Sequence, residues 1–205
     1  MSRFESLLRG GLAELAVDPA CLPQLLGYLA ELEKWNAAYN LSGIRNAEEI
    51  VVRHLLDALA VLPAVSGRVI DIGSGAGIPG LILAIANPAL QMTVLDSNGK
   101  KARFMRHVQR TLKLTNVEVI EDRAEAYVPA QLFDHIISRA FAALGDFLRV
   151  TGHLAAPGGK WLAMKGKLDA DEQAGIPDGF VIVDVKSLVV PSLNEARHLI
   201  IAARS

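Results

Sequence analysis

The sequence predicts an α/β fold, in which helices cover a mainly parallel sheet of seven strands with an antiparallel last strand. From residue 68 onward, short apolar runs alternate with helical stretches, a pattern typical of parallel strands joined by helices. Only residues 191–197 separate the last two apolar runs, which is too short for a helical crossover and indicates an antiparallel pair. The expected strands are residues 68–72, 92–95, 117–120, 133–137, 160–164, 180–190 and 198–203.

The first 66 residues have a helical pattern. After Asp18-Pro19, a helix start signal, leucines recur at three- and four-residue spacing. Asn46 with Glu49 resembles a capping box and predicts a second helix through residue 60. We therefore expect an N-terminal helical region, residues 1–66, and a core, residues 67–205, within one compact domain. Helices of the core are expected at residues 80–86, 98–114 and 144–154.

Composition excludes several classes of protein. The 205 residues are 51% hydrophobic, enough for a full core, and the net charge of −1 excludes a histone-like polycation. The single cysteine, Cys21, excludes an intramolecular disulfide and a thiolate metal cluster. Histidines at i, i+4 spacing are absent, so we expect no metal site.

Targeting signals are also absent from the sequence. The N-terminus lacks a cationic run followed by an apolar stretch, and the most apolar window, residues 78–86, is far shorter than a membrane span of about 20 residues. We expect a soluble cytoplasmic protein with no membrane partner, and a monomer.

The strongest motif is a glycine loop that follows the first expected strand. Gly73, Gly75 and Gly77 alternate with small or apolar residues, which lets a backbone turn tightly and approach a ligand. Pro79 suits the first turn of the next helix, whose N-terminus would favour an anionic ligand group. The alternative is a glycine turn that binds nothing.

The loop departs from two known phosphate-binding patterns. Ile78 stands where the dinucleotide fingerprint has its third glycine, and no Gly-Lys-Ser/Thr ending is present. Asp96, at the end of the second expected strand, is placed to accept both ribose hydroxyls of an adenosine-containing cofactor. Both a dinucleotide and S-adenosylmethionine carry that ribose, so these residues alone leave the two open. As a lone residue, Asp96 could equally be a helix cap.

Seven short stretches, in this order along the chain, resemble one family. They are WNAAYNLS (35–42), RHLLD (53–57), IPG (78–80), LDS (95–97), SRAF (138–141), MKG (164–166) and RHL (197–199). Together they make the sequence similar to the 16S rRNA (guanine-N7) methyltransferase G family, also called glucose-inhibited division protein B. The glycine loop alone would indicate only the wider methyltransferase superfamily.

The resemblance implies a Rossmann-like methyltransferase fold with S-adenosyl-L-methionine as cofactor. The implied reaction is methyl transfer to N7 of a guanine in the decoding-region loop of 16S rRNA, with the RNA or the small ribosomal subunit as partner. By the same resemblance the cofactor pocket falls on Gly73, Ile78, Ala124, Glu125 and Arg139. Spacing alone favours a solvated helix start for residues 123–125 over a contact with the adenine.

The residues are compatible with N7 chemistry. A cysteine nucleophile for carbon methylation is not evident, because Cys21 lies in a leucine-rich helical stripe, and the motif at Ser138 lacks the prolines of exocyclic-amine methyltransferases. Guanine N7 has a free lone pair and no proton to remove, so alignment matters more than a general base. An arginine bonded to O6 and N7 would block that atom, so we assign Arg139 to shaping the cofactor pocket or contacting phosphate.

A basic helix is the candidate RNA surface. No acidic residue interrupts residues 100–113, and its cations recur at helical spacing. These are Lys100, Lys101, Arg103, Arg106, Arg110 and Lys113, which Arg45, Arg53, Lys165 and Arg197 could extend. A solvated helix face is the alternative. We assign substrate positioning to Asn40, Lys165 and Arg197 and name no catalytic residue.

Two other functions stay open from the sequence. The same sheet could methylate a small molecule or a protein, in which case RNA would not be labelled. A non-catalytic protein could bind the adenosyl cofactor without turnover.

Overall fold

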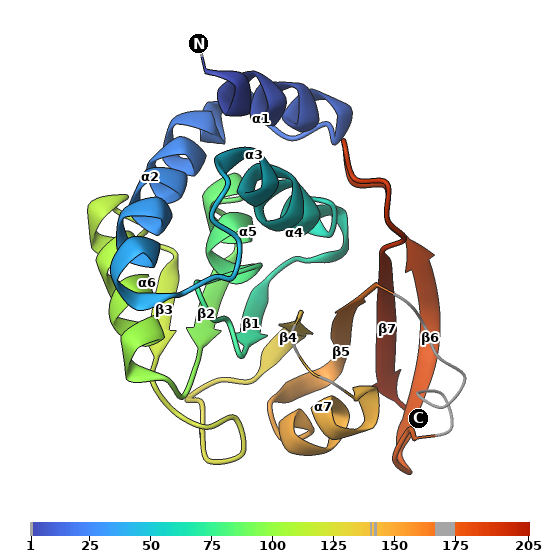
Figure 1. Ribbon diagram of the computed structural model, residues 1–205. Helices are drawn as coiled ribbons and strands as arrows, with labels where there is room; N and C mark the ends of the chain where they lie inside the picture. Colours follow the sequence, from blue (N-terminus) through green and yellow to red (C-terminus); the bar gives the residue numbers. More distant parts are fainter. Residues whose placement is uncertain (1, 140, 142, 167–174) are drawn as a thin grey trace.

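The described residues form one seven-stranded sheet with the strand order β3-β2-β1-β4-β5-β7-β6 (Figure 1). The structure is a computed structural model and describes residues 2–139, 141, 143–166 and 175–205. The strands are β1 (Arg68–Ile72), β2 (Gln91–Leu95), β3 (Val117–Ile120), β4 (Phe133–Ser138), β5 (Ala155–Lys165), β6 (Phe180–Ser187) and β7 (His198–Arg204).

Strand directions bring both halves of the sheet to one functional edge. β1 to β5 pair in parallel, and β7 runs antiparallel between β5 and β6, which confirms the predicted fold class. Lys165, at the end of β5, pairs with His198, at the start of β7. The residues just before β7 therefore lie at the edge where the parallel strands end.

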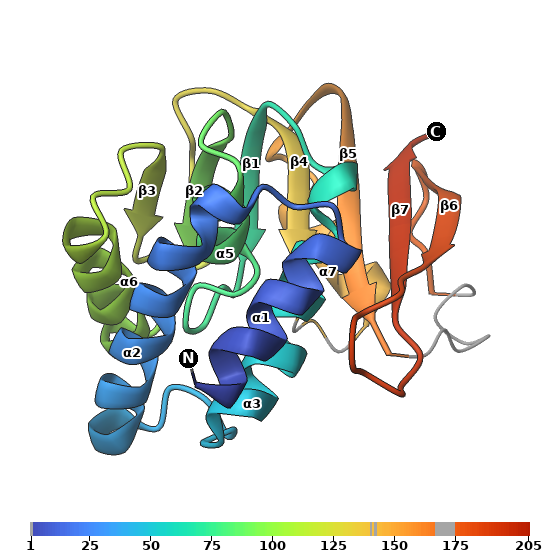
Figure 2. The ribbon, with the colours of Figure 1, turned by 90° about the horizontal axis from the view of Figure 1, so that it is seen from above.

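Helices cover both faces of this sheet. Figures 1 and 2 show α7 on one face and the other labelled helices on the opposite face. They are α1 (Arg3–Glu14), α2 (Leu22–Tyr39), α3 (Ala47–Ile50), α4 (Asp57–Leu59), α5 (Gly80–Ala86), α6 (Gly99–Thr111) and α7 (Leu144–Thr151). Single 3₁₀ turns are η1 (Pro19–Cys21) and η3 (Leu62–Ala64).

The N-terminal helices share their hydrophobic core with the sheet. Leu8, Leu25 and Leu55 belong to the same buried cluster as Val69 of β1 and Leu81 of α5. The leucine spacing predicted an apolar helix face, and this face is buried against β1 and α5. The division into an N-terminal region and a core at residue 66 stays a prediction. The hydrophobic cluster contains residues from both sides of that position.

Two strands differ from their expected bounds by more than one residue. β5 begins at Ala155 rather than at residue 160, because Pro157, Gly158 and Gly159 are accommodated as a bulge in the pairing with β4. Gly158 supplies the positive φ, +78°, that this irregularity requires. β6 ends at Ser187 rather than at residue 190.

The helix expected from Asn46 is continuous but not uniformly α-helical. Asn46 Oδ1 accepts a hydrogen bond from the Glu49 amide at 3.1 Å, as the capping box predicts. Between α3 and α4 the chain forms a π-helical segment, η2 (Val51–Leu56), which the sequence pattern does not predict. Such wide turns are frequent at functional sites.

Candidate functional site

The glycine loop after β1 adopts the backbone that only glycine accommodates easily. Gly73, Gly75 and Gly77 have φ of +68°, +61° and +82°. The amides of Gly73 and Ser74 both donate to the carbonyl of Leu95, at the end of β2. The alternating glycines therefore form a tight turn fixed to the carboxyl edge of the sheet, as predicted.

The start of α5 contacts a buried carboxylate of the protein itself. Asp71 is completely buried, and its Oδ2 accepts the Gly80 amide at 2.8 Å. The prediction of an anionic ligand at this helix start is therefore wrong, because Asp71 provides the anion. A Cβ on Gly80 would lie 2.5 Å from Val94 Cγ1, so the glycine allows the helix to approach the strand closely.

Burial gives Asp71 an unusual proton affinity. Loss of solvent raises its pKa to about 6, although the Gly80 amide and Arg139 act in the opposite direction. Its second oxygen, Oδ1, has no hydrogen-bond partner among the described residues.

A cavity of about 200 Å³ lies beside the loop, and we call it the glycine-loop cavity. Asp96 borders it and is buried, with Oδ2 accepting from the Gly75 amide and Oδ1 from the Asn98 amide, each at 2.9 Å. A Cβ on Gly73 would meet nothing within 4 Å. The lining residues are Ile72, Gly73, Leu95, Asp96, Ser97, Asp122, Arg123, Ala124, Glu125 and Phe141.

Four predicted cofactor residues meet in this cavity: Gly73, Asp96, Ala124 and Glu125. Gly75 does not line the cavity, but its amide donates a hydrogen bond to the Asp96 carboxylate. Ile78 is buried in the core, with 4% of its surface exposed. The space beside Gly73 and the fixed carboxylate fit an adenosine-containing group.

A second cavity of about 360 Å³, the arginine cavity, lies at the same edge of the sheet. Its central group is Asp57, whose Oδ1 accepts from Arg197 Nε at 3.1 Å and whose Oδ2 lies 3.6 Å from Arg139 Nη1. Burial raises the pKa of Asp57, and both arginines oppose that shift. The lining residues are Ile44, Arg53, His54, Asp57, Arg139, Met164, Lys165, Gly166 and Arg197.

Arg139 lies in the arginine cavity and does not line the glycine-loop cavity. Its Nη1 donates to the Arg53 carbonyl at 2.9 Å and lies 3.2 Å from His54 Nδ1. These contacts bind its guanidinium to the π-helical segment and to Asp57, and the assignment of Arg139 to the cofactor pocket stays a prediction. Ala140, within the motif that begins at Ser138, lies outside the described residues.

His54 stays neutral at physiological pH in this cluster. Its Nε2 lies 2.8 Å from the Ser42 hydroxyl, and the ring is buried. Burial, reinforced by the charge of Arg139, lowers the pKa of His54 to about 4. The sequence analysis assigned no role to His54 or Asp57. They follow Arg53 by one and four residues, and this spacing was the only sign that they could lie near it on one helix.

The two cavities adjoin through the segment that follows β4. Lys165 Nζ lines the arginine cavity and donates to the carbonyl of Phe141 at 2.9 Å, while Phe141 itself lines the glycine-loop cavity. Lys165 and Arg197, two of the predicted substrate residues, line the same cavity. The hydrogen bond from Lys165 to Phe141 links that cavity to the predicted cofactor residues.

Asn40, the third predicted substrate residue, lies apart from both cavities. It ends α2 with a left-handed backbone, φ +49°, and its Oδ1 accepts from Arg45 at 2.9 Å. Asparagine is suited to this conformation, which accounts for the residue without a substrate.

The basic helix α6 carries its cations as the spacing predicts. Lys100, Arg103 and Arg110 are exposed, while Arg106 pairs with Glu121 at 2.9 Å. The Asn98 side chain caps the helix directly after Asp96. The helix therefore begins beside the glycine-loop cavity and presents at least three accessible cations.

The described residues contain neither a candidate membrane span nor a cluster of metal ligands. Within them, no helix is both long and apolar enough to cross a membrane. In the same residues, no three His, Cys, Asp or Glu side chains gather as metal ligands would.

Comparison with known proteins identifies the family. Residues 21–200 match the family model described as GidB, rRNA small subunit methyltransferase G. The chain belongs to this family. It is 49% identical over 201 residues to ribosomal RNA small subunit methyltransferase G of Pseudomonas syringae pv. syringae (strain B728a), covering 97% of this chain and 94% of that protein. With the Stenotrophomonas maltophilia (strain K279a) protein of the same name the identity is 50%, covering 94% and 92%.

Solved structures agree on the fold. TrmN from Thermus thermophilus superposes with a TM-score of 0.59 at 19% identity, covering 76% of this chain and 53% of that one. The mitomycin 7-O-methyltransferase MmcR gives 0.59 at 16% identity, covering 86% and 60%. Family membership and sheet architecture both confirm what the sequence motifs predicted.

Proposed function

We propose that this protein transfers a methyl group from S-adenosyl-L-methionine to N7 of a guanine in the decoding-region loop of 16S rRNA. The observation that carries the proposal is the adjacency of the two cavities, one suited to an adenosyl group and one lined by arginine and lysine. Membership in the rRNA small subunit methyltransferase G family supplies the reaction class.

The glycine-loop cavity is the proposed cofactor site. When bound, the cofactor supplies an electrophilic methyl group on a sulfonium. Gly73 leaves room for it, and Asp96, whose oxygens are oriented by two backbone amides, offers its remaining lone pairs to the ribose hydroxyls. Ala124 and Glu125 border the opposite wall, where we place the adenine.

The arginine cavity is the proposed site of the guanine. N7 bears a lone pair and no proton, so the protein has to orient and desolvate the base rather than deprotonate it. Two neighbouring groups agree with this: His54, with a pKa of about 4, is a weak base, and Arg139 is tied through Nη1 to the Arg53 carbonyl. Lys165 and Arg197 are the proposed positioning residues.

The surroundings of the reaction are part of the same proposal. We place the protein in the cytoplasm as a monomer that meets 16S rRNA within a small-subunit particle. The exposed cations of α6 would contact RNA phosphates and add a salt-dependent contribution to affinity.

The test is transfer of tritiated methyl from S-adenosylmethionine to small-subunit particles purified from cells that lack the gene for this protein. Mass spectrometry then identifies the modified nucleoside, and particles from cells that have the gene are the control. A single N7-methylguanosine, absent from the control reaction, is the expected result. Incorporation into protein or a small molecule, or cofactor binding with no incorporation, would contradict the proposal and favour one of the two other functions.

A further inference from the structure

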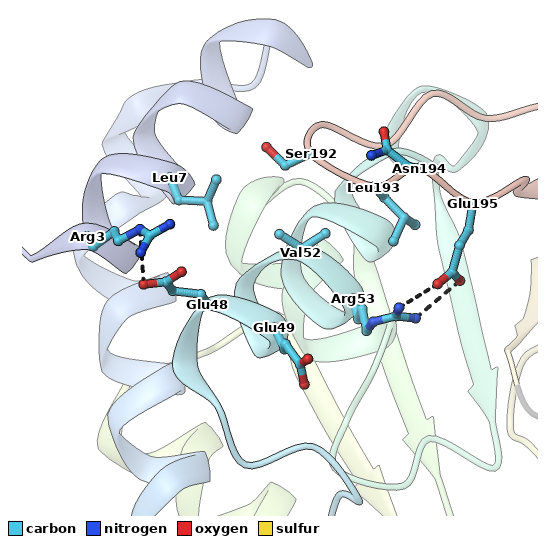
Figure 3. Close-up of a pocket in the computed structure, with 10 residues that line it drawn as sticks. All are labelled: Arg3, Leu7, Glu48, Glu49, Val52, Arg53, Ser192, Leu193, Asn194 and Glu195. Carbon is cyan, nitrogen blue, oxygen red and sulfur yellow. Dashed lines mark hydrogen bonds and ion pairs between the residues drawn. The ribbon is translucent and has the colours of Figure 1, made fainter.

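Two arginines of the arginine cavity share one exposed carboxylate. Arg53 donates to Glu195 with both guanidinium ends, Nη1 to Oε2 at 3.2 Å and Nη2 to Oε1 (Figure 3). Arg197 Nη2 donates to the same Oε2 at 3.2 Å. A single anion with two oxygens therefore receives three charge-assisted hydrogen bonds, the arrangement in which arginines bind phosphate.

Arg197 has a side-chain partner other than Glu195, and Arg53 is positioned by its place on a helix. Arg197 is 20% exposed and keeps its Nε on buried Asp57, and Arg53 is part of the π-helical segment between α3 and α4. Glu195 itself lies 45% exposed on the loop before β7. We call Arg53 and Arg197 the cationic fork. The fork would persist if the carboxylate of Glu195 moved away.

Displacing this carboxylate has a low energetic cost. Ion pairs between exposed groups contribute little to stability, because water and salt compete with them. Hydrogen bonds from Arg53 and Arg197 lower the pKa of Glu195, so it is ionised wherever RNA binding would be measured. A phosphodiester carries the same charge and the same pair of oxygens.

We infer that Arg53 and Arg197 form a binding site for one RNA phosphodiester, and that Glu195 occupies this site in the free protein. The inference rests on the proposed function and deepens it. Both arginines line the arginine cavity, so the phosphate would be one next to the nucleotide that enters it. RNA binds there by exchange, with the phosphate taking the place of the carboxylate.

The experiment compares Glu195→Gln with a matched control, Glu48→Gln. Glu48 belongs to the neighbouring cavity of about 560 Å³ and pairs with Arg3, so the control removes the same charge nearby without touching the fork (Figure 3). Affinity for a synthetic hairpin of the decoding-region loop is measured over a range of salt concentrations. S-adenosylmethionine affinity is measured alongside.

Glu195→Gln is expected to bind the hairpin about three- to tenfold more tightly, since the competing carboxylate is gone. The slope of log affinity against log salt should steepen by less than the roughly 0.7–0.9 of a whole phosphate contact, because both proteins bind the same phosphate and only the uptake of a cation by the displaced carboxylate is lost. Cofactor affinity should not change. In an Arg53→Gln background the gain from Glu195→Gln should shrink by more than half.

A purely structural role for Glu195 predicts a different result. It would lower the melting temperature of Glu195→Gln below that of Glu48→Gln and leave the affinity and slope equal, which would overturn the inference. If wild-type protein methylates RNA while the two variants behave alike, only the proposal of the phosphate site is excluded. Wild-type protein that binds cofactor but neither binds nor methylates RNA removes the proposed function itself.

Discussion

Asp71 combines complete burial with one unpartnered oxygen directly beneath the glycine loop. Its pKa, about 6 in the folded protein, exceeds the value of 3.8 for the exposed group, so between these values the folded state binds more protons than the unfolded state. Stability from this residue therefore falls as pH rises from about 4 to about 6, by up to about 3 kcal/mol.

Asp71→Asn should remove this dependence, because the amide still accepts from Gly80 and gives the orphaned position a neutral group. Relative to wild type, the variant should gain stability steadily between pH 4 and pH 6 and stay level above. Urea unfolding at several pH values measures the difference. Asp184→Asn, which removes an exposed carboxylate, is the control; a gain of equal size there would contradict the assignment.

Single residues were predictable where a local pattern determines them. The glycines need positive φ, and Asp96 follows a strand beside them. The spacing of these residues along the chain was therefore sufficient to predict that they lie together. The contacts of Arg139 in the arginine cavity were not predictable, because its partners come from residues 53–57, far along the chain. Asp57 and His54 acquire their roles only through such distant contacts.

Among the elements, α2 has a direct link to the cofactor site. Tyr28 is buried on this helix, and its hydroxyl donates to the carbonyl of Ala76 in the glycine loop at 2.8 Å. The N-terminal region therefore fixes the loop as well as covering the sheet. Leucine spacing predicted the helix but not this bond, because a tyrosine on an apolar face is normally explained by packing alone.

Tyr28→Phe should leave the Ala76 carbonyl buried without a donor, at a cost of about 1–3 kcal/mol. The loop loses its anchor to α2, so S-adenosylmethionine should bind several-fold more weakly. Calorimetric titration gives the affinity and urea unfolding the stability. Tyr39→Phe, which removes an exposed hydroxyl at the end of the same helix, is the control. Equal affinities for the two variants would refute the anchoring role.

Strands and helices were predicted most accurately where a glycine, proline or asparagine stands at either end of the apolar run. β1, β3 and α5 have the expected bounds. The start of β5 was missed because a bulge can carry Pro157 and Gly158 through a strand, and the π-helical segment was missed because no residue pattern distinguishes it from an α-helix.

For the whole molecule, charge segregation is the main predictor of RNA binding. The net charge is −1, yet α6 presents Arg103 and Arg110 to solvent on one side. Replacing both with glutamine should reduce the salt slope of RNA binding by about 1.4–1.8 and spare cofactor affinity. Replacement of Arg9 and Arg149, exposed on other helices, is the charge-matched control. An unchanged slope in the α6 variant would exclude this helix from the interface.

The position of β7 in the sheet has a consequence for biosynthesis. Asp57 meets Arg197 across 140 positions of sequence, and Arg53 meets Glu195 across 142. Contacts that distant form late, and here they wait until β7 has left the ribosome and inserted beside β5. A nascent chain that stops after β5 has made every residue of the cofactor cavity but lacks the fork that would hold RNA. An unfinished chain would therefore lack one of the RNA contacts that we propose.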